Sequence, residues 1–187
     1  MAQIAQRMHA VCTPQTDQAA QATADAFRQG MRRLAGAVCI VAAGAEGERG
    51  GLTATAVCSV SADPPRLLVC VNRSAGAHAL IAGEQRLSVN VLRADQRLLA
   101  DRFASPGIKG EARFAEGAWR QWHGVPVLAD AAVHFACRVH QQLETGTHTI
   151  FICDVLGCLH GEPADCLLYL DGRFRKLAAG EDAACAH

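Results

Sequence analysis

The stretch GLTATAVCSVSADPPRLLVC, residues 51–70, decides the fold class. It begins at a glycine pair, continues as a strand-like run of small residues, and turns through the stiff corner Asp63-Pro64-Pro65. Prolines are accepted where a strand begins but not inside a central strand. The stretch therefore predicts two consecutive strands, over residues 51–61 and 66–72.

The first of these strands is poor in bulky side chains. Alternation along a strand places Thr53 and Thr55 on one face, and Leu52, Ala54 and Ala56 on the other. Such small residues leave room above the strand for a flat ligand, whose polar edge can bond to hydroxyl and backbone groups. Further along, residues 59–61 can offer hydroxyl and N–H donors to an anion such as phosphate. An ordinary threonine-rich strand followed by a turn is the alternative that these residues leave open.

The remaining sequence predicts more strands, mostly joined by short connections. Tight turns are indicated by Gly146 within residues 144–147 and by Asp171-Gly172. About eight local strands with two or three short helices predict a mainly β fold, an antiparallel barrel rather than a doubly wound sheet. The further expected strands cover 37–44, 86–92, 131–145, 148–162 and a pair over 166–177, the helices cover 25–34, 75–85 and 94–104, and a loop covers 105–126.

Composition narrows the class of protein. Half of the 187 residues are apolar, and 18 basic side chains balance 18 acidic ones, which argues against disorder and against an electrostatic surface for nucleic acid. No apolar run has the length of a signal peptide or a membrane span. The nine cysteines show no C-x-x-C pair, so we interpret them as reduced core residues of a cytoplasmic protein. We expect a flexible arm over 1–24, one domain over 25–177 and a loose tail over 178–187.

Several common chemistries lack a motif in this sequence. No G-x-G-x-x-G or phosphate-binding loop follows a strand, and no G-x-S-x-G element supports acyl transfer. The eight histidines form no H-x-x-x-H or H-x-H pair, so no metal site is predicted. If a nucleotide binds, residues outside these known nucleotide-binding motifs must hold it.

Four segments together resemble the flavin reductase-like, FMN-binding split-barrel family, and within it the pyrimidine-utilisation flavin reductases most. The resemblance implies an antiparallel Greek-key split β-barrel that forms a homodimer and binds FMN, or FAD in some members, near the subunit interface. The segments, which occur in the family's order, are GLTATAVCSVSADPPRLLVCVNRSAG (51–76), RLSVNVLRADQRLLADRFA (86–104), GTHTIFICDV (146–155) and LLYLDGRFRKL (167–177).

The resemblance also implies which residues contact the flavin. The isoalloxazine ring is expected over Thr53-Ala54-Thr55-Ala56, and the phosphate around Ser59, Val60 and Ser61. Four more residues are expected to line the flavin site, although turn caps, a core aromatic residue and a solvated lysine are the ordinary alternatives. They are Asn72, Asn90, Phe103 and Lys109.

Two further positions are implied for the second nucleotide. His148, in Gly146-Thr147-His148, is placed near the nicotinamide, where a neutral imidazole can hydrogen-bond the carboxamide. Arg173, after the Asp171-Gly172 turn, is expected to reach the flavin or the dinucleotide across the dimer, with an exposed hairpin arginine as the alternative.

The implied activity is hydride transfer from NADH or NADPH to FMN or FAD, with release of reduced flavin to a partner oxygenase. This reaction needs orientation more than acid–base groups, because the flavin carries the electronic chemistry. Two alternatives remain open at this stage. One is a split-barrel reductase that retains its flavin and reduces another acceptor such as a cobalt corrinoid, and the other is a flavin- or haem-binding module without turnover.

Overall fold

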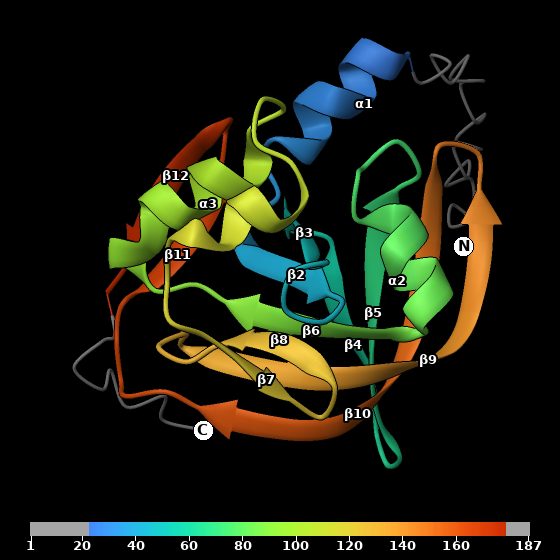
Figure 1. The fold of residues 1–187 in the computed structure, drawn as a ribbon. Coiled ribbons are helices and arrows are strands. Elements are labelled where there is room, and N and C mark those ends of the chain that lie inside the picture. The colour runs from blue at the N-terminus through green and yellow to red at the C-terminus, as the bar shows by residue number, and fades with distance from the viewer. Residues whose placement is uncertain (1–22, 179–187) are drawn as a thin grey trace, which may run out of the picture. The chain divides into compact units, whose positions relative to one another are not determined.

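The computed structural model describes residues 23–178 (Figure 1). The chain divides into two compact units, the second of which begins at Arg32. In the first unit, helix α1 (Ala24–Met31) begins where the Thr23 hydroxyl accepts a hydrogen bond from the Ala26 N–H at 3.1 Å. Nearly all of the predicted arm over 1–24, and all of the predicted tail except residue 178, lie outside the described residues.

Seven strands form one antiparallel sheet in the order β3-β2-β6-β9-β10-β5-β4. Figure 1 shows this sheet curving round, with β6 and β9 side by side near its middle. The strands at its two edges, β3 and β4, are separated in sequence only by Thr55 and Ala56. The bounds are β2 Cys39–Ala43, β3 Gly50–Ala54, β4 Val57–Ala62, β5 Pro65–Asn72, β6 Arg86–Val91, β9 Val133–Thr145 and β10 His148–His160.

This arrangement confirms the predicted split barrel and corrects one of its strands. The single strand predicted over 51–61 is two strands, and no ladder joins β3 to β4 within the described residues. The sheet must curl until its edges approach each other, because two residues cannot span a flat sheet of seven strands. Thr55 and Ala56 are both exposed, so neither side chain anchors the chain to one edge.

The barrel interior is filled by alternate residues of its strands. Val69, Val89 and Phe151 are completely buried there, and α2 (His78–Glu84) adds Ile81 to the same cluster. A second cluster lies on the other side of β2, where Ile40 packs against α3 (Arg97–Ala104). Strand β2 is therefore buried on both faces, which explains why its sequence is a continuous apolar run.

A smaller sheet of order β1-β11-β12 contains β1 (Gly36–Ala37), β11 (Cys166–Leu170) and β12 (Arg173–Leu177). The Asp171-Gly172 turn between β11 and β12 has φ of 54° and 75°. Two positive φ values are the signature of the tight type I′ hairpin that an Asp-Gly pair predicts. The expected strand pair over 166–177 is thus confirmed.

The predicted loop over 105–126 is partly wrong. After η1 (Ala94–Gln96) and α3, the chain forms η2 (Gly110–Ala115) and a hairpin of β7 (Trp119–Trp122) and β8 (Val125–Leu128). The hairpin turns at His123 and Gly124, with φ of 50° and 76°. β8 contains Pro126 and pairs within the described residues only with β7, so the missing N–H is accepted at a strand edge. Among residues 23–178, no helix combines the length and apolar character needed to cross a membrane.

Candidate functional site

Two pockets lie on either side of Thr53 in β3. One has a volume of about 790 Å³ and the other about 330 Å³, and Thr53 and Ala104 contribute to both walls. These volumes are in the range of small-molecule sites in proteins. The larger pocket is lined by residues 50–53, the turn over 74–77, and Phe103, Ala104, Pro106, Lys109, Gly110 and Arg113; the smaller by Val38, Thr53, Ala54, Thr55, Asp101, Ala104, Tyr169 and Phe174.

The small residues of β3 leave open space, as their sequence predicts. Leu52 and Ala54 pack on the barrel core, whereas Thr53 faces α3 and donates a hydrogen bond from Oγ1 to the Ala100 carbonyl at 2.6 Å. The Thr53 hydroxyl is therefore already engaged as a donor, and Thr53 presents its methyl group and lone pairs as a lining residue. Contact between this strand and a flavin stays a prediction.

Gly51 allows the aromatic floor of the larger pocket to form. A Cβ at this position would lie 2.7 Å from Phe103 Cε1 and 3.1 Å from the Val41 carbonyl oxygen. Only a residue without a side chain lets the Phe103 ring approach the strand so closely. Phe103 is almost fully buried, and its ring packs edge-on against Phe114 with centroids 5.0 Å apart.

Arg113 organises the wall opposite β3, and its role was not predicted from the sequence. Its guanidinium donates to four backbone carbonyls, those of Gly51, Phe103, Ser105 and Ile108. The Gly51 and Ser105 bonds are both 2.8 Å long. Burial lowers the pKa of Arg113 from its ordinary value. Because most of its N–H donors already have backbone partners, Arg113 shapes the pocket rather than offering a free fork to a ligand.

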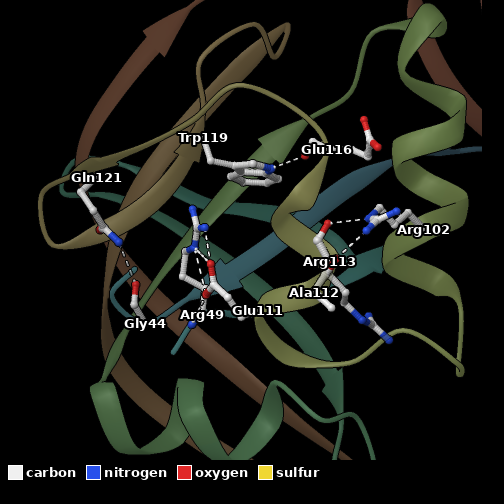
Figure 2. A network of polar contacts seen from close by, with 9 residues as sticks. All are labelled: Gly44, Arg49, Arg102, Glu111, Ala112, Arg113, Glu116, Trp119 and Gln121. Carbon is white, nitrogen blue, oxygen red and sulfur yellow. Dashed lines mark hydrogen bonds and ion pairs between the residues drawn. The ribbon is translucent and has the colours of Figure 1, made fainter. Parts of the chain in front are cut away.

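A second arginine fastens η2 to the β2–β3 turn (Figure 2). Arg49 donates to Glu111 from its backbone N–H at 2.9 Å and from Nε at 2.9 Å, and its guanidinium lies over the Phe114 ring at 4.6 Å. These bonds lower the pKa of Glu111 from its ordinary value. Figure 2 also shows Arg102 reaching the carbonyls of residues 112 and 113 from α3. The segment that carries Lys109 is thus held from two sides.

The larger pocket is electrostatically positive. Its charged lining residues are Lys109 and Arg113, and no carboxylate belongs to the lining. Within the described residues, Lys109 forms no ion pair, so its ammonium group is available to a ligand. A pocket lined by one sign of charge favours an anionic ligand.

Asn90 and Asn72 are not in the pocket walls. Asn90 is completely buried: its Nδ2 donates to the Ile40 carbonyl at 3.1 Å and its Oδ1 accepts from the Leu128 N–H at 2.8 Å. Asn90 therefore joins β6 to β8 in the core, and its predicted contact with the flavin stays a prediction. Asn72 is exposed, and its Oδ1 accepts from the Ser74 N–H at 2.9 Å, which makes it a cap for the turn that borders the pocket.

The predicted phosphate residues Ser59, Val60 and Ser61 lie on β4, at the other edge of the sheet. The Ser61 hydroxyl donates to the Pro64 carbonyl at 2.6 Å, so it is engaged within the turn. Ala56 lies in the connection between β3 and β4. None of these four residues lines either pocket of the described chain.

His148 and Gly146 lie at the β9–β10 hairpin, outside both pockets. Gly146 has φ of 56°, as the turn requires, and exposed His148 pairs with Asn72 across the β10–β5 ladder. The imidazole Nδ1 is 2.8 Å from the Thr147 hydroxyl. The structure thus brings together Thr53, Ala54, Thr55, Phe103 and Lys109. Gly146 and His148 are in neither lining, but their hairpin pairs with Asn72 beside the turn that borders the larger pocket. Arg173 lines a third pocket.

The fold and pockets define a split-barrel protein with a site of nucleotide size and positive charge. A family model, the flavin reductase like domain, matches residues 31–178. An FMN reductase (NADH), RutF, of Variovorax paradoxus (strain S110) is 43% identical over 154 residues, which are 82% of this chain and 85% of that protein. The chain therefore belongs to the flavin reductase-like family.

Solved structures agree with this assignment. The NADH:FAD oxidoreductase SgcE6 of Streptomyces globisporus C-1027, solved with NAD and FAD fragments, has a TM-score of 0.77 and 31% identity, covering 84% of this chain and 94% of that one. The styrene monooxygenase flavin reductase SMOB of Pseudomonas putida S12 has a TM-score of 0.72 and 27% identity, covering 80% and 96%. The family predicted from the four sequence segments is thus confirmed.

Proposed function

We propose that this protein is an NADH-dependent FMN reductase that supplies reduced flavin to a partner oxygenase. The observation that carries the proposal is the pair of pockets joined at Thr53, because a flavin and a nicotinamide ring must lie against each other for hydride transfer. The name of the Variovorax relative supports FMN and NADH as the substrates. The styrene monooxygenase component supports a two-component partnership.

The residues present fit FMN. The strand Thr53-Ala54-Thr55 leaves space for a planar ring, and Gly51 keeps the neighbouring wall free of a Cβ. Lys109 supplies a positive charge for the phosphate. Bound flavin supplies the electron-accepting chemistry, while the protein supplies orientation and electrostatics. Contributions from Ala56, Ser59, Val60, Ser61, Asn72, Gly146 and Arg173 stay predictions.

The residues of this chain act mainly by positioning. Arg113 fixes the carbonyls around the larger pocket, and Phe103 forms a rigid floor below it. His148, at the exposed start of β10, offers a ring nitrogen that can hydrogen-bond the carboxamide of the nicotinamide. No general acid or base is required of any of them, because a hydride would pass directly from the dihydronicotinamide to the flavin.

We also propose a homodimer, supported by an apolar patch on the outer face of the barrel. Strands β5 and β10 direct alternate residues into the core, so the others face outward, and the outward residues in the middle of both strands are apolar where solvent would favour polar ones. We define the outer patch as Cys58, Leu68, Cys70, Leu143, Ile150 and Ile152, which are cross-strand neighbours on β4, β5, β9 and β10. An apolar patch of this kind suits a two-fold contact with a second copy.

The test is an NADH oxidation assay with FMN and with FAD. We expect turnover with FMN, and we expect His148→Ala to raise the KM for NADH about tenfold, the equivalent of one lost hydrogen bond. His160→Ala, at the other end of β10, is the matched control and should leave this KM unchanged. Absence of NADH oxidation with either flavin would refute the proposal.

A washing experiment separates a released flavin from a retained one. We expect FMN to pass through the membrane on repeated ultrafiltration, since a flavin that is delivered to a partner must dissociate. Flavin retained through washing would instead favour a reductase acting on another acceptor, such as a corrinoid. Localisation in the cytoplasm stays a prediction from the cysteine pattern.

A further inference from the structure

A third pocket, of about 500 Å³, lies between α3 and the β11–β12 hairpin. It shares Asp101, Tyr169 and Phe174 with the 330 Å³ pocket, which in turn shares Thr53 and Ala104 with the largest one. The three pockets therefore follow one another along α3, with the β3 strand in the middle. The third pocket is lined by Arg97, Asp101, Tyr169, Gly172, Arg173, Phe174 and Arg175.

The charge of this third pocket is strongly positive. It has three arginines and a single carboxylate, Asp101, which lies 3.7 Å from Arg97 Nε. Within residues 23–178, neither Arg173 nor Arg175 has a side-chain ion pair or hydrogen bond. Two exposed arginines that have no partner within residues 23–178 make the surface beside this pocket attractive to an anion. Arginine forks match phosphate oxygens in geometry.

The pocket also has an aromatic wall. The rings of Tyr169 and Phe174 meet edge to face with centroids 5.5 Å apart, and the Arg97 guanidinium lies 5.6 Å from the Phe174 centroid. Tyr169, the only tyrosine in the chain, is 40% exposed. An exposed aromatic side chain beside arginines offers a flat surface for a purine base next to donors for its phosphates.

We propose that this third pocket binds the adenosine diphosphate group that NADH and FAD share. The inference rests on the proposed function, because the adjoining pockets then hold the reacting rings. The adenosine portion distinguishes these dinucleotides from FMN, which has one phosphate and no purine. The arginines at the β11–β12 hairpin thus select the dinucleotide substrate without contact with the reacting atoms.

The direct test is calorimetric titration of the purified protein with ADP, with no flavin and no turnover. We expect ADP to bind the wild-type protein, and the double variant Arg173→Gln/Arg175→Gln to bind it at least about tenfold more weakly. Lys176→Gln removes one positive charge from the same strand outside the pocket, and should bind ADP like the wild type. Circular dichroism verifies that these exposed substitutions leave the fold intact.

Two further measurements decide which dinucleotide places its adenosine diphosphate group in the third pocket. If the double variant has a higher KM for NADH at saturating FMN than the wild type, with unchanged flavin affinity, the site belongs to NADH. Weaker binding of FAD with unchanged binding of FMN, followed by fluorescence quenching, assigns it to FAD. Failure of wild-type protein to bind ADP, or equal binding by the double variant, overturns the inference. Arginine-dependent ADP binding in a protein that oxidises no NADH would sustain this site and refute the proposed reductase activity.

Discussion

Arg113 shows how a single side chain can hold the wall of a pocket through bonds to the backbone. Four carbonyls from β3, α3 and the following loop accept from one guanidinium. Lysine keeps the charge but has three donors on a single nitrogen and no planar fork. We expect Arg113→Lys to lower the free energy of unfolding by about 1–3 kcal/mol, the cost of unsatisfied polar groups, and to weaken FMN binding.

Urea denaturation and flavin fluorescence measure the two effects of this variant. Arg86→Lys is the matched control, because Arg86 is exposed and makes one bond, of 2.9 Å, to the His123 carbonyl. If Arg113→Lys were as stable as Arg86→Lys and bound FMN equally well, the positioning role would be wrong.

At the scale of residues, some features of the site could be predicted from the sequence and others could not. The open space above β3 could be predicted because it depends on local alternation of small side chains. Asn90 could not be placed, since its role depends on the Leu128 N–H, which lies 38 residues further along. Arg113 has no sequence signature either, because its partners are backbone carbonyls, which every residue has.

At the scale of elements, the strands were predictable and their partners less so. The Asp171-Gly172 hairpin follows from local turn chemistry and is present. The division of residues 51–61 into β3 and β4 depends on closure of the whole sheet, and no residue within this run predicts it. The β7–β8 hairpin was not predicted; β8 contains a proline, which a strand accepts at an edge, and its one ladder partner within residues 23–178 is β7.

The contact between η2 and the β2–β3 turn should depend on pH. Hydrogen bonds from Arg49 hold the pKa of Glu111 below its ordinary value of 4.5. Because the folded pKa is depressed, the stabilisation is present above the unfolded pKa and is lost as pH falls through the folded pKa. We expect Glu111→Gln to be less stable than wild type at pH 7, with the difference shrinking as the solution becomes acidic.

Thermal unfolding of both proteins from neutral to acidic pH measures this difference. Glu116→Gln is the matched control, because the structure engages only the backbone carbonyl of exposed Glu116, through Trp119 Nε1. A Glu111→Gln deficit that stayed constant across the acidic range would show that packing, and not the ion pair, links these elements.

At the scale of the whole molecule, the outer patch is the feature that an isolated chain leaves unexplained. Apolar residues on the outside of an antiparallel barrel gain little in a monomer, whereas burial against a second copy stabilises by about 25 cal/mol per Å². Ile150 lies near the centre of this patch, opposite Cys70 on β5 and Leu143 on β9. A lysine there would place a charge in the contact, so we expect Ile150→Lys to convert a dimer into a monomer.

Light scattering during size-exclusion chromatography measures the molar mass of the wild type and of Ile150→Lys, and so distinguishes dimer from monomer. Leu98→Lys is the control, because Leu98 is 83% exposed on α3, outside the outer patch, and that variant should remain dimeric. A monomeric wild type, or an Ile150→Lys variant that remains dimeric, would refute the proposed contact. If the monomeric variant also bound FMN more weakly while its spectrum stayed that of a folded β protein, the barrel would need its second copy to complete the flavin site.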